Sequence, residues 1–187
     1  MGTRSPGSIQ KTKHVLSEAL LSLAEKRSFR KISVGDICRA AMVSRSAFYS
    51  HFADKYELLS FALEEKLRLQ APGSQNQTLE GQLSALLKSV QENRRAVYHI
   101  FMADMSPELM DIFQKTLQAA AVRRLEELQR SGVRLPGDIR LTAAFLVGGL
   151  ANVIISWIRE NCAVPAEEIA KCQCGLIAAL GAAEKNG

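Results

Sequence analysis

Residues 33–55 read SVGDICRAAMVSRSAFYSHFADK. Two short segments of this stretch, Val34–Ala40 and Arg45–His51, have helical character and are separated by about four residues. Ser33 and Asp36 can form a capping box at the start of the first segment, and Ser44 can cap the second. Two short helices joined by a turn of this length predict a helix-turn-helix.

Apolar residues within the stretch predict how its two helices pack. Ala40 and Ala41 are small enough to let the helices approach closely. The apolar wedge that we expect between them consists of Ile37, Val43, Phe48 and Phe52. Such a wedge would fix the angle at which the second helix is presented.

The second helix also carries a polar arc of short side chains, roughly opposite Phe48. The arc consists of Ser46, Tyr49 and Ser50, with Arg45 and Ala47 at its margins. In a major groove Arg45 can pair with guanine O6 and N7, and Ser46 can bond to several bases. Ala47 or Tyr49 can touch a thymine methyl group. The arc therefore predicts base reading by this helix.

Phosphate contacts are expected at the end of the second helix and just beyond it. Ser50, His51 and Lys55 are suited to phosphate oxygens. Asp54-x-x-Glu57 predicts the start of a further helix, and the unpaired N–H groups of a helix start also favour an anion near Lys55.

The charge distribution supports a polyanionic partner. The net charge is +5, and residues 1–68 hold 12 Lys and Arg against 7 Asp and Glu, whereas residues 69–187 hold 12 of each kind. The whole excess is therefore N-terminal, where the helix-turn-helix is expected. Nucleic acid is the most common partner of such a segment.

Helical spacing of apolar residues continues along almost the whole chain, and no long stretch alternates with a period of two residues. We therefore expect an all-α protein. Caps and breaks predict nine helices, at residues 9–26, 33–40, 45–51, 54–70, 79–91, 94–105, 107–130, 138–160 and 165–180. Residues 27–31 are expected to form a polar, basic break.

Several other classes of protein are disfavoured. The four cysteines show neither a CxxC pair nor zinc-ligand spacing, so no metal, cofactor or disulfide framework is expected. No phosphate loop or catalytic pair is present, which argues against an enzyme. The uncharged run Leu141–Ile158 is long enough for a membrane span, but Gly148, Gly149, Asn152 and Ser156 dilute it. We expect a cytoplasmic protein in which this run packs against protein.

The pattern ISVxDIxxAAMVSxSxFYxHFxxKxxLL at residues 32–59 resembles the tetracycline-repressor (TetR) family. The run from Phe48 to Lys55 is the most diagnostic part, and the match extends over roughly Val15–Leu63. The resemblance implies base-facing positions for Arg45, Ser46, Ala47 and Tyr49, and backbone-facing positions for Ser33, Ser50, His51 and Lys55. Together with Ser44, these residues are the predicted DNA-binding set.

Met42 departs from the family pattern, which has glycine in the turn between the two helices. A residue with a Cβ costs about 1 kcal/mol or more in a left-handed conformation. We expect the turn to be strained or rearranged, without loss of DNA binding.

The resemblance further implies an N-terminal DNA-binding domain, residues 9–53, and a helical ligand-binding and dimerisation domain, residues 54–187. The role that it implies is that of a homodimeric repressor that binds a pseudo-palindromic operator and responds to a small molecule. Candidate ligand-binding residues are Tyr98, His99, Phe101, Met102, Met105 and Phe113, although ordinary core packing is the favoured explanation of these side chains. Residues 148–168 resemble one C-terminal branch of the family, which leaves open a coregulator that acts through a protein partner.

Overall fold

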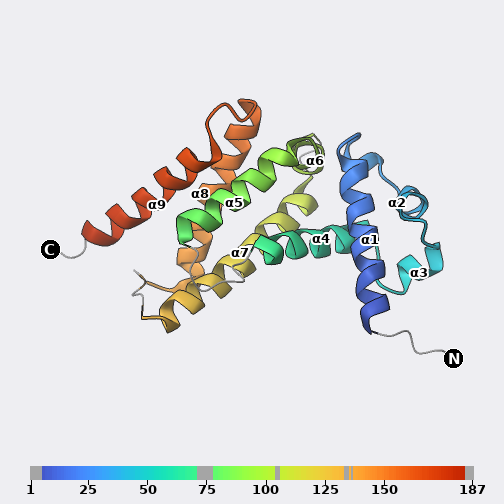
Figure 1. The fold of residues 1–187 in the computed structure, drawn as a ribbon, viewed down its shortest axis with the longest axis horizontal. Coiled ribbons are helices and arrows are strands. Elements are labelled where there is room, and N and C mark those ends of the chain that lie inside the picture. The colour runs from blue at the N-terminus through green and yellow to red at the C-terminus, as the bar shows by residue number, and fades with distance from the viewer. Residues whose placement is uncertain (1–5, 71–77, 104–105, 133–134, 136, 184–187) are drawn as a thin grey trace. The chain divides into compact units, whose positions relative to one another are not determined.

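A computed structural model describes residues 6–70, 78–103, 106–132, 135 and 137–183, and these residues contain helices but no strand (Figure 1). The α-helices are α1 (Pro6–Ala24), α2 (Val34–Ala41), α3 (Arg45–Tyr49), α4 (Lys55–Gln70), α5 (Leu79–Glu92), α6 (Arg94–Val97), α7 (Pro107–Arg130), α8 (Ile139–Arg159) and α9 (Ala166–Ala183). Across these ranges the predicted all-α fold with nine helices is confirmed.

The segment before α2 differs from the prediction. The expected polar break contains a 3-10 turn, η1 (Phe29–Lys31), in which Ser28 Oγ accepts a hydrogen bond from the Arg30 N–H. Phe29 is fully buried. A single apolar residue among basic ones has no periodicity, so the pattern could not reveal this anchor.

A second difference follows α6, where one helix over residues 94–105 was expected. The chain instead passes from α6 into a π turn, η2 (Tyr98–Met102), whose closing bond runs from the Ala103 N–H to the Tyr98 carbonyl at 2.8 Å. Ile100 and Phe101 are both buried. The wider turn changes the helical register that the sequence pattern assumes.

The chain forms two compact units. The first comprises the described residues of Met1–Lys66 and Arg95–Phe113, and the second those of Leu67–Arg94 and Gln114–Gly187. This division concerns packing. The predicted domains, residues 9–53 and 54–187, were defined by DNA binding and ligand binding, so their boundary stays a prediction about function.

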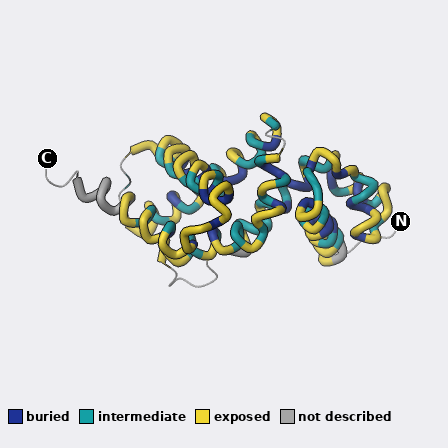
Figure 2. The backbone as a smooth tube through the Cα atoms, turned by 90° about the horizontal axis from the view of Figure 1, so that it is seen from above, coloured by how far each residue is buried: buried dark blue, intermediate teal, exposed yellow. Residues whose placement is uncertain are grey.

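The first unit has a continuous apolar core. Figure 2 colours the buried residues of the chain dark blue. Its fully buried side chains include Leu16, Leu20, Phe29, Ile37, Phe48, Leu58 and Leu59. Two exposed contacts join α1 to α4: a hydrogen bond between His14 Nδ1 and Glu65 at 3.3 Å, and an ion pair between Lys66 Nζ and Glu18 at 3.2 Å. The helix-turn-helix therefore packs on helices that precede and follow it.

The second unit contains α5, α8 and α9. α5 packs against α9, and Lys88 Nζ lies 2.5 Å from a carboxylate oxygen of Glu167 across that pair of helices. The Trp157 indole N–H donates to the Val164 carbonyl at 2.7 Å, which closes the turn between α8 and α9. Leu87 on α5 is fully buried.

The two faces of α8 have different surroundings. One stripe is buried and consists of Ala143, Val147, Ala151, Ile154 and Ile158. The other stripe, which we call the open face of α8, consists of Leu141, Phe145, Gly148, Asn152 and Ser156 and is exposed. α8 is long and apolar enough to cross a membrane, and 28% of its apolar window is buried within the chain.

Candidate nucleic-acid interface

Both short helices of the predicted helix-turn-helix begin as their sequence indicates. Ser33 Oγ accepts a hydrogen bond from the Asp36 N–H, and the Asp36 carboxylate accepts one from the Ser33 N–H, each at 3.1 Å. This is the predicted capping box. Ser44 Oγ accepts from the Ala47 N–H at 3.1 Å and starts α3.

The turn between α2 and α3 is left-handed at Met42, with φ 53° and ψ 39°. The Val43 N–H donates to the Cys38 carbonyl at 2.9 Å, which satisfies a carbonyl at the end of α2. The turn is therefore not rearranged. Met42 adopts the left-handed conformation for which glycine is best suited.

Replacing Met42 with glycine should raise the free energy of unfolding by about 0.5–1 kcal/mol, because glycine adopts a positive φ without a Cβ clash. Little packing would be lost, since Met42 is 94% exposed. Urea unfolding of Met42→Gly and of a Met42→Ala control would measure the effect. Equal stability of the two variants would show that the left-handed backbone is not the source of strain.

The apolar wedge that supports α3 has largely the predicted members. Ile37, Phe48 and Phe52 are buried, and Val43 is half-buried. Of the two small residues, Ala41 is buried, but Ala40 is exposed, so only Ala41 can serve the close approach of the helices. Phe48 belongs to α3, and its buried side chain anchors the helix so that the opposite face is exposed.

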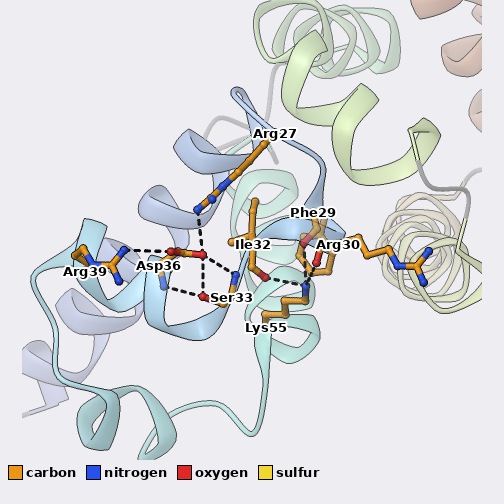
Figure 3. A network of polar contacts seen from close by, with 8 residues as sticks. All are labelled: Arg27, Phe29, Arg30, Ile32, Ser33, Asp36, Arg39 and Lys55. Atoms are coloured by element: carbon orange, nitrogen blue, oxygen red, sulfur yellow. Dashed lines mark hydrogen bonds and ion pairs between the residues drawn. The ribbon is translucent and has the colours of Figure 1, made fainter.

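Asp36 is the centre of a polar network that holds the start of α2 (Figure 3). Its carboxylate accepts from the Ser33 hydroxyl at 2.8 Å and lies 3.1 Å from Arg27 Nη2 and 3.2 Å from Arg39 Nη1. The Ser33 hydrogen bonds, followed by the charge of Arg27 and the hydrogen bond from Arg39, lower the pKa of Asp36 to about 2. The ionised carboxylate thus joins the segment that follows α1 to α2.

Because the pKa of Asp36 is lowered by folding, its contribution to stability should be present above pH ~4 and be lost as the pH falls towards about 2. We expect Asp36→Asn to lower the thermal midpoint at neutral pH. The difference from the wild type should shrink across the same acidic range. Thermal melts at several pH values, with Glu64→Gln on the exposed side of α4 as a control, would measure it; a pH-independent difference would contradict the linkage.

The predicted base-facing residues lie at the surface of α3. Arg45, Ser46 and Tyr49 are exposed, and Ala47 is half-buried. The Tyr49 side chain is 58% exposed, and its ring meets the edge of Phe48 with centroids 5.4 Å apart. The buried wedge thus supports the exposed arc through the contact between Phe48 and Tyr49. Contact of the arc with DNA bases remains a prediction.

The serines of the predicted DNA-binding set that lie outside the base-facing arc have additional roles within the chain. The Ser33 and Ser44 hydroxyls cap helices, and Ser50 Oγ donates to the Ala47 carbonyl at 2.8 Å. A phosphate oxygen accepts hydrogen bonds, so the Ser33 and Ser50 hydroxyls, which donate to the Asp36 carboxylate and the Ala47 carbonyl, would have to redirect their protons to bind one. His51 is half-buried. Phosphate contacts at Ser33, Ser50 and His51 remain predictions, as does the DNA contact of Ser44.

Lys55 has a role that the sequence did not suggest (Figure 3). Its ammonium group donates to the carbonyls of Phe29, Arg30 and Ile32 at 2.9, 3.3 and 2.8 Å. It also lies 4.6 Å from the centre of the Phe29 ring. Lys55 therefore clamps η1 to the start of α4, and the predicted phosphate contact would compete with these carbonyls.

The candidate ligand-binding residues take part in ordinary packing where they are described. Phe101 is buried, and its ring centre lies 4.7 Å from that of Phe113. His99 Nδ1 lies 2.7 Å from the Ala24 carbonyl, whereas Tyr98 is 47% exposed. Met102 is half-buried against the core of the first unit, and Met105 lies outside the described residues. The packing of Phe101, Met102 and Phe113 matches the core alternative, whereas the exposed Tyr98 does not. Ligand binding by the candidates stays a prediction.

Comparison with protein families covers both parts of the chain. Residues 16–60 match the family described as bacterial regulatory proteins, tetR family. Residues 77–178 match the family described as transcriptional regulator C-terminal region. The first match contains the whole α2–turn–α3 unit, and the second spans more than half of the chain.

Two curated relatives have related sequences. The dhaKLM operon transcriptional activator DhaS of Lactococcus lactis is 29% identical over 104 residues, which cover 55% of this chain and 56% of that protein's length. The regulator AcrR of Shigella flexneri is 25% identical over 181 residues, covering 84% of this chain and 83% of that protein.

Solved structures show the same fold. The dihydroxyacetone kinase operon activator DhaS has a TM-score of 0.66 and 20% identity, with 90% of this chain and 95% of that chain covered. The transcriptional regulator FadR from Bacillus subtilis, solved in complex with stearoyl-CoA, has a TM-score of 0.58 and 14% identity over 87% of this chain and 96% of that chain. From its capped helix-turn-helix and the two family matches, the chain belongs to the TetR family of bacterial transcriptional regulators.

Proposed function

We propose that this protein is a homodimeric, sequence-specific DNA-binding repressor that responds to a small-molecule effector. One observation carries the DNA-binding part: α3 holds the Arg45, Ser46 and Tyr49 side chains at the surface while Phe48 anchors the helix from below. Short polar side chains beside an arginine are suited to base edges in a major groove.

Homodimer formation is supported by the open face of α8. Leu141 and Phe145 are 73% and 72% exposed, so two large apolar side chains lie one helical turn apart on the surface. Gly148 on the same face would allow a partner helix to approach closely. A twofold dimer would place two α3 helices on half-sites about 34–36 Å apart.

The proposed effector rests on fold similarity. FadR of Bacillus subtilis, whose fold this chain shares, was solved with stearoyl-CoA. At 14% identity this similarity does not transfer the ligand, so the proposal concerns the class of regulation and not the chemical identity of the effector. Repression is proposed as the outcome of DNA binding.

A mobility-shift assay on duplexes selected from the host genome tests DNA binding directly. Arg45→Ala and Tyr49→Ala should each weaken binding to a selected duplex by about 5- to 150-fold, the range expected for one lost base contact of about 1–3 kcal/mol. Leu79→Ala on α5 serves as a control. Unchanged binding by both variants would contradict base reading by α3.

A second candidate function is that of a dimeric coregulator which acts through a protein partner. The match to a relative named as a transcriptional activator favours considering it, because activation does not require the repressor mechanism. If this candidate were correct, the purified dimer would select no duplex sequence from the genome. Selection of a defined sequence would support the repressor proposal instead.

A membrane-anchored protein is the remaining alternative, since α8 has the required length and composition. Expression of the full chain in detergent-free buffer discriminates between a membrane-anchored protein and a cytoplasmic one. A folded dimer recovered without detergent supports cytoplasmic localisation, whereas recovery only from the membrane fraction contradicts it.

A further inference from the structure

We propose that Gly35 is a positioning residue for DNA recognition, because it leaves open the space on α2 in which the Arg45 guanidinium lies. The inference rests on the proposed DNA-binding function. It adds Gly35 to the residues that matter for DNA binding. Gly35 has no side chain to touch a base and acts only through Arg45.

The geometry at Gly35 identifies what a side chain there would displace. A Cβ placed on Gly35 would lie 2.5 Å from Arg45 Nη2, 3.4 Å from Cζ and 3.5 Å from Nε. The three nearest heavy atoms thus all belong to the same guanidinium group. A separation of 2.5 Å is far shorter than a carbon–nitrogen van der Waals contact of roughly 3.5 Å, so the arginine would have to move.

Arg45 extends from the first position of α3 back across α2. Its charge is close enough to Cys38 to oppose, in part, the rise in the pKa of that thiol caused by burial. Gly35 and Cys38 are three residues apart on α2 and therefore share a face of the helix. The guanidinium thus lies along that face.

The backbone of α2 does not itself require glycine at this position. Gly35 lies inside the helix, and among the described glycines the one with a positive φ is Gly132. Alanine is favoured over glycine in a helix, so glycine here weakens α2 locally. The space that Gly35 leaves for the Arg45 guanidinium explains why glycine stands here although it weakens α2.

Holding a long side chain in place before binding has a direct benefit. A flexible arginine loses rotamer freedom when it contacts DNA, and this loss opposes binding. A guanidinium already seated against Gly35 loses less. Alanine at residue 35 would push the group off α2 and remove this preorganisation while leaving the charge on the protein.

A double-mutant cycle with the full-length protein tests the inference. The probes are a duplex selected by the wild-type protein from a pool with a randomised core and a scrambled duplex of the same composition. Gly35→Ala should weaken binding to the selected duplex about tenfold, within the range for one arginine–guanine contact. Binding to the scrambled duplex should change by less than about twofold, because its affinity depends on charge.

In an Arg45→Ala background, adding Gly35→Ala should have almost no further effect, because the group that it displaces is absent. The matched control is Gly7→Ala, which alters the second residue of α1 in the same way where no heavy atom lies within 4 Å of the new Cβ. The thermal midpoint of Gly35→Ala should not fall, since alanine favours the helix.

The positioning role would be overturned if Gly35→Ala bound the selected duplex with wild-type affinity. It would also be overturned if Gly35→Ala lowered that affinity equally in the wild-type and the Arg45→Ala backgrounds. A lowered thermal midpoint accompanied by equal losses on both duplexes would also overturn it, since that pattern indicates a damaged fold. If the wild-type protein selected no duplex sequence, the proposed function would itself fail, and the role of Gly35 would fail with it.

Discussion

Replacing Phe145 with glutamate is expected to convert the proposed dimer into monomers and to lower the affinity for a two-half-site duplex by about 100-fold or more. Phe145 is 72% exposed on α8 although it is one of the largest apolar side chains of the chain. A carboxylate at the centre of an apolar interface would have to lose its water without a partner, which costs several kcal/mol.

The loss of DNA affinity would follow from geometry and not from damage to α3. A dimer binds its second half-site as an intramolecular step, and a monomer must bind each half-site separately. Affinity for a duplex with a single half-site should therefore be nearly unchanged in Phe145→Glu. Sedimentation analysis and mobility shifts on the two duplexes would measure the two effects together.

Leu79→Glu is the matched control, because Leu79 is also an apolar residue at the surface, 39% exposed, but lies at the start of α5. This variant should remain dimeric and bind as the wild type does. Should Phe145→Glu stay dimeric and bind both duplexes normally, the open face of α8 would not be the interface between copies of this chain.

Replacing Lys55 with methionine is expected to lower the free energy of unfolding by about 2–4 kcal/mol, since each hydrogen bond to a charged group contributes about 1.5–3 kcal/mol and water replaces part of the loss. Methionine keeps a similar unbranched stem but removes the ammonium group. The carbonyls of Phe29 and Ile32, which are the closest acceptors, would lose their donor.

Lys66→Met is the control on the same helix. Lys66 forms an exposed ion pair with Glu18, so its replacement should cost only about 0.2–1 kcal/mol. Chemical unfolding of both variants would reveal the difference. Equal losses would show that the carbonyl clamp at Lys55 contributes no more than a surface charge.

DNA binding distinguishes the clamp from the phosphate contact that the sequence suggested for Lys55. If the ammonium group stays on its carbonyls in the complex, Lys55→Met should leave the slope of log affinity against log salt unchanged. A phosphate contact would instead reduce that slope by about one. We expect the slope to be unchanged, because the three donors of the Lys55 ammonium group already match three carbonyl acceptors.

The helix-turn-helix could be predicted closely because its signals are local. A serine cap, a carboxylate three residues later and a wedge of aromatic residues act within one or two helical turns. The capping box at Ser33 and the burial of Phe48 were therefore predictable. The pattern singled out the turn at Met42 as strained or rearranged, and the structure shows it left-handed.

The contacts that cross between elements could not be predicted in the same way. Nothing near Lys55 in the sequence indicates that its ammonium meets carbonyls more than twenty residues earlier. Phe29 has no apolar neighbours in its short segment, and the π turn at Tyr98–Met102 has no distinct pattern. Each depends on which elements the folded chain brings together.

By itself the sequence determined the all-α class, the capped α2–turn–α3 unit and the exposed arc of α3, because helix periodicity and capping act over a few residues. Only the tertiary structure decided that Lys55 clamps η1, that Arg45 lies over Gly35 and that Phe145 remains exposed. These outcomes depend on distances between residues far apart in the chain or on different helices. Such distances exist only after the chain has packed.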